Sequence, residues 1–270
     1  MTWVPDAPPP PPTMRWWHWL IALPRLVLLA ALILLGLALY LAVRLIERPL
    51  AGGRRPVTAR IQQEVCRATL AVIGLRVERK GAPMHEGGAL VANHASWLDI
   101  FVLVAGQRLT FVAKAEVAGW AVIGWLARAT GTLFIRRDRK EAGAQVAQIA
   151  ERVGRDELLL FFPEGTSTDG RRVLPFKATL FAAFLGPGLA EDLRVQPIAL
   201  RYTAPPGEDP RAYGWFGAMG FAPHFLWVLG RPRQGRVEVR YGAPIAVREV
   251  PSRKALAAAA EAAVRGMFEG

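Results

Sequence analysis

An unbroken run of 18 uncharged, mostly apolar residues near the N-terminus, Leu26 to Val43, constrains this chain more than any other segment. Wound as an α-helix, such a run is long enough to cross the hydrocarbon core of a bilayer, which is about 30 Å thick. Three tryptophans precede it, as an interfacial aromatic cluster would: Trp16, Trp17 and Trp19. The sequence therefore predicts a membrane anchor ahead of the rest of the chain.

The charges on either side of this run predict its orientation. Arg15 and Arg25 precede the run, and four arginines follow it: Arg44, Arg48, Arg54 and Arg55. The excess of positive charge after the run predicts that the C-terminal bulk lies on the cytoplasmic side of the inner membrane. A helix lying in one leaflet, bent at Pro24, is the alternative to a spanning helix. A signal peptide is disfavoured because no small-residue cleavage site precedes Arg44.

The overall composition also favours contact with a membrane. Hydrophobic residues make up 52% of the chain, and 34 basic against 22 acidic residues give a net charge of +12. Such a surface favours anionic partners such as lipid headgroups. Nucleic acid is disfavoured because the basic residues are scattered and no nucleic-acid motif is visible. Cys66 is the only cysteine, which excludes disulfides within the chain and cysteine-based zinc sites.

Beyond the apolar run, segments with strand and helix patterns alternate along the chain. Strands are expected at residues 75–79, 88–93, 109–113, 132–135, 157–162, 195–202 and 236–241, and helical stretches at 58–74, 96–104, 114–127, 138–153, 178–185 and 252–267. This alternation favours an α/β fold, with a mostly parallel sheet flanked by helices and an N-terminal membrane-anchoring helix. The proline run from Pro8 to Pro12 predicts an extended, poorly ordered tail.

An Asn93-His94 pair stands at the end of one expected strand, and Asp99 follows it. A histidine beside a carboxylate can take a proton from an alcohol, while the acid fixes the imidazole tautomer. Two helical residues at this spacing would diverge by roughly 140°, so they meet only if His94 lies in the strand-to-helix turn. The alternative is that Ser96 and Asp99 merely form a capping box. No obvious serine or cysteine nucleophile accompanies them, so the alcohol is expected to belong to the substrate.

Three further segments place charged residues at or after expected strand ends, where open α/β sheets gather ligands. Lys114 ends one strand, and a surface pair with Glu116 is its alternative role. Arg136 and Arg137 follow another strand, where they could clamp a phosphate or carboxylate or form an ordinary charged turn. Glu164 follows five large apolar residues and a proline, so it is expected to meet a cation or a hydrogen-bond donor, for which Arg137 or Lys114 are candidates. A structural ion pair without a role in chemistry is the alternative for this glutamate.

Together these segments resemble the glycerophospholipid acyltransferase family, whose bacterial type member is 1-acyl-glycerol-3-phosphate acyltransferase. Four blocks match in order over roughly residues 74–200: Asn93-His94…Asp99, Gly131…Phe134-Ile135…Arg137, Phe162-Pro163-Glu164-Gly165-Thr166, and Pro197-Ile198. The resemblance implies that His94 and Asp99 are catalytic. It implies that the second and third blocks hold the acceptor, and the substrate-binding residues expected on this basis are Lys114, Arg137, Glu164, Gly165 and Thr166.

The resemblance also implies an activity and a division of the chain. Residues 1–13 are expected to be a disordered proline-rich tail, 14–55 the membrane anchor and 56–270 the acyltransferase domain. The expected reaction moves a fatty acyl group from acyl-CoA or acyl-carrier protein to the free hydroxyl of a lyso-lipid in the membrane. The first expectation for that acceptor is 1-acyl-sn-glycerol-3-phosphate, which would give phosphatidic acid. No metal or other cofactor is expected, because the thioester is already activated.

One departure from the family pattern bears on the acceptor. After Glu-Gly-Thr the family usually has an arginine that helps hold the acceptor phosphate, whereas this chain has Ser167. The stretches from Ser167 to Phe181 and from Trp215 to His224 look like the lyso-ornithine lipid acyltransferase branch, whose acceptor has no phosphate. Lyso-ornithine lipid is therefore the alternative acceptor. Three nearby cations could still supply the missing charge: Arg171, Arg172 and Lys177.

Two other classes of protein remain open on sequence grounds. In a non-enzymatic membrane scaffold His94 and Asp99 would be degenerate, and the intact blocks argue against this class. A membrane-anchored serine hydrolase would need a nucleophile elbow, and no Gly-x-Ser-x-Gly motif is present. The apolar residues between 216 and 228 are expected either to form an interfacial patch or to pack in the core. The remaining histidines are expected to be structural or solvated: His18, His85 and His224.

Overall fold

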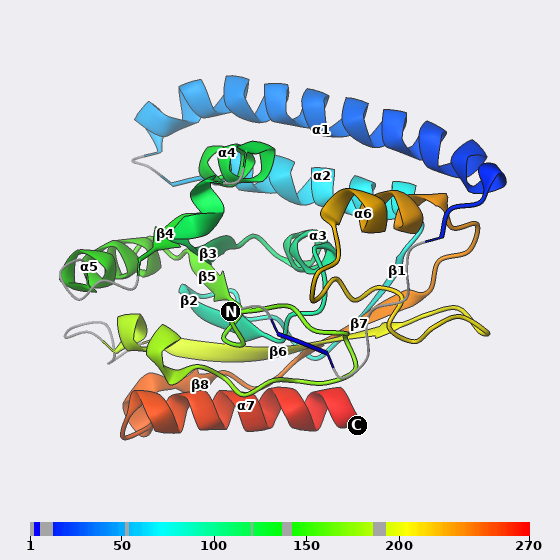
Figure 1. Cartoon of the computed structure of the whole chain (residues 1–270). Coiled ribbons are helices and arrows are strands. Elements are labelled where there is room, and N and C mark those ends of the chain that lie inside the picture. The colour runs from blue at the N-terminus through cyan, green and yellow to red at the C-terminus, as the bar shows by residue number, and fades with distance from the viewer. Residues whose placement is uncertain (1–2, 6–12, 52–53, 120, 137–141, 186–192) are drawn as a thin grey trace.

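A mixed β-sheet forms the centre of the chain in the computed structural model, which describes residues 3–5, 13–51, 54–119, 121–136, 142–185 and 193–270 (Figure 1). Over these residues the strands are β1 (Arg76–Lys80), β2 (Gly88–Ala92), β3 (Thr110–Lys114), β4 (Leu133–Ile135), β5 (Leu158–Phe161), β6 (Arg194–Thr203), β7 (Arg236–Tyr241) and β8 (Ile245–Ala246). They lie in the order β1-β7-β6-β2-β5-β3-β4, and β8 pairs with β6. Neighbours are parallel except where β6 meets β7 and β8, so the expected mostly parallel α/β sheet is confirmed.

Helices cover both faces of this sheet. They are α1 (Trp16–Leu50), α2 (Thr58–Ile73), α3 (Leu98–Gly106), α4 (Ala121–Ala129), α5 (Ala142–Val153), α6 (Phe221–Gly230) and α7 (Arg253–Glu269). The short 3-10 helices are η1 (Ala115–Gly119), η2 (Ala178–Leu180), η3 (Ala182–Phe184) and η4 (Val247–Glu249). In Figure 1, α2, α3 and α6 lie above the sheet and α7 lies below it, while α1 lies above α2.

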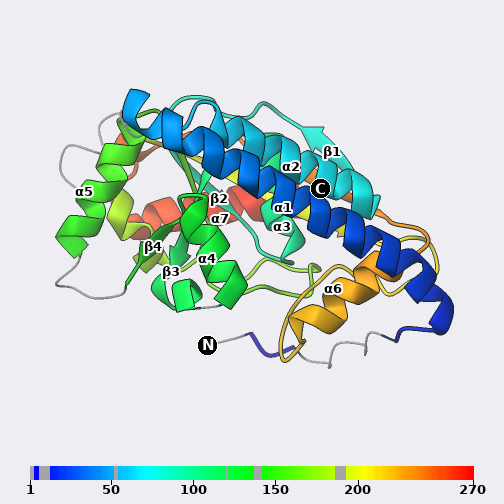
Figure 2. The ribbon, with the colours of Figure 1, turned by 90° about the horizontal axis from the view of Figure 1, so that it is seen from above.

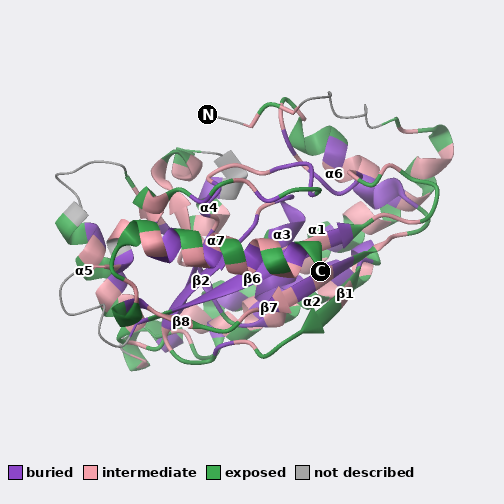
Figure 3. Ribbon diagram, turned by 90° about the horizontal axis from the view of Figure 1, so that it is seen from below, coloured by how far each residue is buried: buried purple, intermediate pink, exposed green. Residues whose placement is uncertain are grey.

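The central strand β2 shows why the sheet is buried on both sides. All five of its residues are buried. Successive side chains of a strand point to opposite faces, and here Leu90 and Ala92 pack in the core beneath α2 and α3, whereas Ala89 and Val91 pack in the core above α7. Figure 3 shows the strands buried behind α7, whose outer face is exposed. A parallel strand covered on both faces is expected to be this apolar.

The long helix α1 lies along the surface of the domain, packed against α2 and α6 (Figure 2). Gly36 allows a close approach, because a Cβ atom there would overlap a methyl group of Val65 on α2. From the N-terminal third of α1, the Arg25 guanidinium donates to the carbonyl oxygens of Leu229 and Arg231 at 2.8 Å each. The opposite face is apolar and exposed, as the 71% exposure of Leu35 illustrates. By length and composition α1 could cross a membrane.

Most expected elements appear within two residues of their predicted bounds. The helical stretch expected at 114–127 is divided into η1 and α4, and the one expected at 178–185 consists of the two short 3-10 helices η2 and η3. The helix α6 was not expected, because its apolar residues show no clear periodicity and Pro223 lies among them. That proline lies in the first turn of α6, where its missing N–H costs no hydrogen bond. Residues 138–141 of the helix expected from 138 lie outside the described residues.

The prediction of a disordered tail over residues 1–13, like the division at residues 55 and 56, stays a prediction. The structure describes residues 3–5 and 13 of that tail.

Candidate active site

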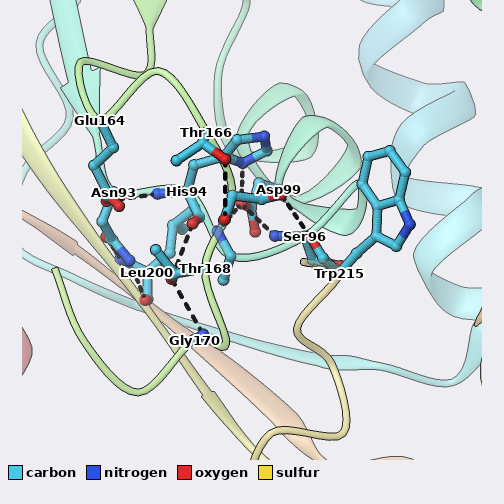
Figure 4. Close-up of polar contacts among 12 residues, drawn as sticks. Asn93, His94, Ser96, Asp99, Glu164, Thr166, Thr168, Gly170, Leu200 and Trp215 are labelled. Carbon is cyan, nitrogen blue, oxygen red and sulfur yellow. Dashed lines mark hydrogen bonds and ion pairs between the residues drawn. The ribbon is translucent and has the colours of Figure 1, made fainter. Parts of the chain in front are cut away.

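His94 and Asp99 meet at the junction of β2 and α3, as the sequence predicts. His94 lies two residues after the end of β2, and Asp99 lies in the first turn of α3 (Figure 4). The imidazole Nδ1 of His94 lies 2.7 Å from the carboxylate Oδ2 of Asp99. The neighbouring Asn93 holds the strand end in place, because its side-chain amide pairs with both the N–H and the carbonyl oxygen of Leu200 on β6. The strand-to-helix turn therefore brings the two groups together.

The Asp99 carboxylate is fully buried and well supplied with donors. Besides the His94 contact, Oδ2 accepts hydrogen bonds from the backbone N–H groups of Ala95 (2.8 Å) and Ser96 (3.0 Å). Oδ1 accepts a hydrogen bond from the hydroxyl of Tyr202 on β6 at 2.6 Å. A buried carboxylate is costly unless donors surround it, and here both oxygens of Asp99 accept hydrogen bonds.

The capping-box alternative describes only part of this contact set. The Asp99 side chain does accept from the backbone of Ser96, as the acidic member of a capping box would. The hydroxyl of Ser96 is buried without a hydrogen-bond partner among the described residues, and the cap position of α3 is Trp97. One Asp99 carboxylate therefore binds both the helix start and the imidazole, so the two roles are not exclusive.

The imidazole of His94 is fixed on one side and open on the other. Phe162 stacks on the ring with centroids 4.0 Å apart and planes 13° apart. The His94 side chain is 19% exposed, whereas the Asp99 side chain is fully buried. With Nδ1–H donating to Asp99, the Nε2 atom carries the lone pair, and no described residue hydrogen-bonds to it. The ring can therefore accept a proton at Nε2.

Glu164 holds the main chain of His94 from the third sequence block. Its Oε1 accepts a hydrogen bond from the His94 backbone N–H at 3.0 Å, and Oε2 is buried without a partner among the described residues. Burial raises the pKa of Glu164 to about 8, although the backbone N–H groups of His94 and Leu174 oppose the shift. The side chain is then mostly protonated at pH 7. Glu164 thus meets hydrogen-bond donors, as expected, and these are backbone N–H groups. Of the two candidate partners, Lys114 donates to Gly165 instead, and Arg137 lies outside the described residues.

Two lysines converge instead on Gly165. The Lys114 ammonium donates to the Gly165 carbonyl oxygen at 2.7 Å. A Cβ atom on Gly165 would lie 3.0 Å from the Lys177 Nζ, and the backbone φ here is +71°. Only glycine accepts this conformation without strain and leaves room for Lys177. The third block therefore carries positive charge close to His94.

The next two residues of this loop bind segments that are remote in sequence. The hydroxyl of Thr166 accepts a hydrogen bond from the backbone N–H of Trp3 at 3.2 Å. The hydroxyl of Ser167 donates to the carbonyl oxygen of Trp215, so position 167 faces the loop after β6. Arg137, the remaining expected substrate-binding residue, lies outside the described residues.

The apolar stretch between 216 and 228 belongs partly to the core and partly to the surface. Phe216 and Val228 are buried, whereas Phe221 is 37% exposed. His224 is buried and structural, as expected: its Nδ1 accepts from the Trp97 indole N–H at 3.0 Å, and burial lowers its pKa to about 4.

Sequence reasoning missed two residues that touch this site, Tyr202 and Trp3. Tyr202 is 103 positions from Asp99 and Trp3 is 163 positions from Thr166. The only available signal for Tyr202 was its place on the strand after the fourth block. A tryptophan in a proline-rich tail gave no signal of a contact.

Comparisons with known proteins agree with this geometry. The sequence model described as Acyltransferase matches residues 74–201. A lyso-ornithine lipid O-acyltransferase of Rhodobacter capsulatus is 56% identical over 97% of this chain and 95% of its own length. A 1-acyl-sn-glycerol-3-phosphate acyltransferase of Neisseria meningitidis is 39% identical over 57% of this chain and 60% of its own length. The crystal structure of a 1-acyl-sn-glycerophosphate acyltransferase from Thermotoga maritima is similar in fold, with a TM-score of 0.56, 19% identity, and coverage of 87% of this chain and 94% of that one.

Proposed function

This chain belongs to the acyltransferase family, and from that premise we propose that it is a lyso-ornithine lipid O-acyltransferase. The observation that carries the chemistry is the 2.7 Å contact between His94 Nδ1 and Asp99 Oδ2 beside an open Nε2. The choice of acceptor is supported by the 56% identity to a relative of that name over nearly the whole chain. It is also supported by Ser167, which stands where the family usually has a phosphate-binding arginine and is turned toward Trp215.

In the proposed reaction, the hydroxyl of the lyso-lipid lies beside His94 Nε2. The imidazole removes the hydroxyl proton while the oxygen attacks the thioester carbonyl of the donor. Asp99 holds Nδ1–H and stabilises the imidazolium that forms. When the tetrahedral intermediate collapses, the C–S bond breaks and the thiolate takes the proton from the imidazolium. A new ester and a free thiol result, with no acyl group on the protein at any stage.

The charges around Gly165 indicate how the site would bind the lipid headgroup. An ornithine headgroup bears a carboxylate and an ammonium, and the cations around Gly165 suit its carboxylate. Because Glu164 is mostly protonated at pH 7, its side chain does not neutralise Lys114 or Lys177. We therefore retain Lys114, Glu164, Gly165 and Thr166 as substrate-binding residues, together with Arg137 from the sequence alone.

The donor is proposed to be a thioester of coenzyme A or of acyl-carrier protein. Both carriers are anionic, and the net charge of +12 would attract either one. The thioester is already activated, so the proposed reaction requires no metal ion or other cofactor.

The protein is proposed to lie on the cytoplasmic face of the inner membrane, with α1 in the plane of one leaflet. A helix of 35 residues is about 52 Å long, well beyond a hydrocarbon core of about 30 Å. The helix α1 packs against α2 and α6. Trp3 lies before α1 and Thr166 lies after it, and their hydrogen bond requires both to be on the same side of the membrane. A spanning α1 would separate them.

A second candidate acceptor, 1-acyl-sn-glycerol-3-phosphate, is favoured by the similarity to the Neisseria relative of that specificity. The two lysines at Gly165 could bind a phosphate as well as a carboxylate. Against it stands the absence of the family's arginine at position 167.

A direct comparison of acceptors tests the proposal. Purified full-length protein is offered lyso-ornithine lipid and lysophosphatidic acid in matched vesicles with one acyl donor, and thiol release is measured. We expect kcat/KM to be at least tenfold higher for lyso-ornithine lipid. Equal values, or a preference for lysophosphatidic acid, would contradict the proposed acceptor and favour the second candidate.

A further inference from the structure

The N-terminal segment Trp3–Pro5 lies against two loops that border the candidate active site (Figure 1, dark blue near the N label). The Trp3 N–H donates to the Thr166 hydroxyl at 3.2 Å, and the Trp3 ring lies 5.6 Å from the ring of Phe216. Pro5 packs beside Gly217, where a Cβ atom would lie 3.5 Å from the proline Cδ. These contacts tie the segment before α1 to residues 163 and more positions away.

Both loops that Trp3 touches are hydrogen-bonded directly to the catalytic turn. The Thr168 N–H donates to the His94 carbonyl oxygen at 2.9 Å, and the Trp215 N–H donates to the Ala95 carbonyl oxygen at 2.8 Å. The hydroxyl of Ser167 links the two loops through the Trp215 carbonyl oxygen. A shift in either loop would therefore move the third sequence block relative to His94.

Trp3 also orients a cation of this loop. The Arg172 guanidinium carbon lies 5.1 Å from the centre of the Trp3 ring, in cation–π geometry. On its other side Arg172 pairs with Asp169, with Nη2 and Oδ2 3.1 Å apart. Since the Arg172 side chain is 44% exposed, the tryptophan face restricts a group that would otherwise sample many rotamers.

We propose that Trp3 is a positioning residue of the acceptor site, which fixes the loop from Gly165 to Arg172 for binding the lyso-lipid headgroup. The inference rests on the proposed function, because it assigns this loop to the acceptor. The described contacts of Trp3 are with that loop and Phe216. Its substitution therefore affects binding of the acceptor and not of the acyl donor.

Steady-state kinetics of the full chain in vesicles test the proposal with Trp3→Ala, Trp3→Phe and Trp16→Ala. Trp16 is the matched control, because it is a 77% exposed tryptophan at the start of α1. Trp3→Ala is expected to raise the KM for lyso-ornithine lipid about tenfold, with kcat and the donor KM within twofold of wild type. Both variants keep the backbone N–H that donates to Thr166, but only Trp3→Phe keeps an aromatic face, so it should stay within threefold. Trp16→Ala should leave the acceptor KM unchanged.

An acceptor KM within twofold of wild type for Trp3→Ala would overturn the proposal. So would an equal rise in both KM values, or the same rise in Trp16→Ala, since either assigns the effect to general stability or to membrane binding.

Limited trypsin digestion gives a readout that does not depend on activity. The Trp3 face covers Arg172, so we expect cleavage after Arg172 to be about tenfold faster in Trp3→Ala than in wild type or Trp16→Ala. Equal cleavage rates in all three would overturn the positioning role. A wild-type protein that acylates no lyso-lipid yet shows this protection would refute the proposed function and leave the contact standing.

Discussion

The catalytic turn His94–Asp99 and the headgroup loop Gly165–Arg172 are built in opposite ways. The turn is short in sequence and nearly closed to solvent, and the Asp99 carboxylate is held by donors on both oxygens. The loop is assembled from remote segments that bring Trp3, Lys114 and Lys177 to it, and it keeps exposed cations. The His94–Asp99 pair is thus set mainly by local geometry, whereas the proposed acceptor loop depends on contacts between remote segments. Substitutions in the turn should act on kcat, and substitutions in the loop should act on the acceptor KM.

The largest effect is expected from removing the base in the catalytic turn. His94→Ala should lower kcat by about 10³-fold or more, because a positioned general base contributes roughly 10²–10⁴-fold. Asp99→Asn should cost about 10²–10³-fold, because an amide can stabilise the wrong imidazole tautomer. Thiol release with saturating acceptor and donor measures both. Asp209→Asn, in a surface loop beside Arg211, is the control and should stay within twofold. Near wild-type turnover in His94→Ala would remove the catalytic assignment.

A smaller effect on the same turn is expected from the hydroxyl of Tyr202. Tyr202→Phe removes one donor from a buried carboxylate, and a hydrogen bond to a charged group is worth about 1.5–3 kcal/mol. We expect kcat to fall about tenfold with the acceptor KM unchanged. Tyr213→Phe is the matched control, because the Tyr213 hydroxyl donates a hydrogen bond to Gln234 rather than to Asp99. If both variants lose kcat equally, Tyr202 acts through packing and not through Asp99.

In the headgroup loop, the expected effect falls on binding. Lys177→Met keeps the length of the side chain but removes the charge beside Gly165. The acceptor KM should rise about fivefold, while kcat changes less than twofold. Lys254 is exposed on α7, and Lys254→Met is the control that should leave both constants unchanged. If Lys177→Met lowers kcat without changing the acceptor KM, the loop acts on the chemical step, and its separation from the catalytic turn is contradicted.

The smallest expected effect concerns stability at the boundary between the two regions. Glu164 has a pKa of about 8 in the folded chain against 4.5 for an ordinary glutamate, so the folded state holds a proton that the unfolded state releases between these values. Stability contributed by this group therefore falls as pH rises from about 5 to 8. Glu164→Gln does not titrate, so its stability relative to wild type should rise over that range, by on the order of 1–3 kcal/mol.

Denaturant unfolding of the purified proteins in detergent at pH 5, 6, 7 and 8 measures this difference. Glu151→Gln, a surface carboxylate paired with Arg155, serves as control. A stability difference between Glu164→Gln and wild type that does not change with pH would show that Glu164 is not protonated in the fold.

The same contrast explains what the sequence could and could not predict. The meeting of His94 and Asp99 followed from helix geometry over six residues, and the sheet followed from apolar runs with turn signals. Two regions of secondary structure differ from expectation: η2–η3, where the apolar periodicity is weak, and α6, where Pro223 interrupts the pattern.

Contacts across long sequence separations carried no such signal. Glu164 was expected to meet a cation or a donor, with Arg137 and Lys114 as the candidates. Its described donors are backbone N–H groups, which no residue pattern records. The bonds of Tyr202 to Asp99 and of Trp3 to Thr166 depend on how β6 and the N-terminal segment are placed in space. The local contact of His94 with Asp99 was therefore predictable, and the remote contacts that surround it were not.

The central claim is that the lipid hydroxyl, activated by His94, attacks the thioester directly. Rapid mixing of the full-length protein with radiolabelled acyl donor, followed by acid quench, tests it with and without lyso-lipid. Direct attack predicts no labelled protein in either case and release of thiol only when acceptor is present. One equivalent of acyl-protein formed before acceptor is added would contradict it.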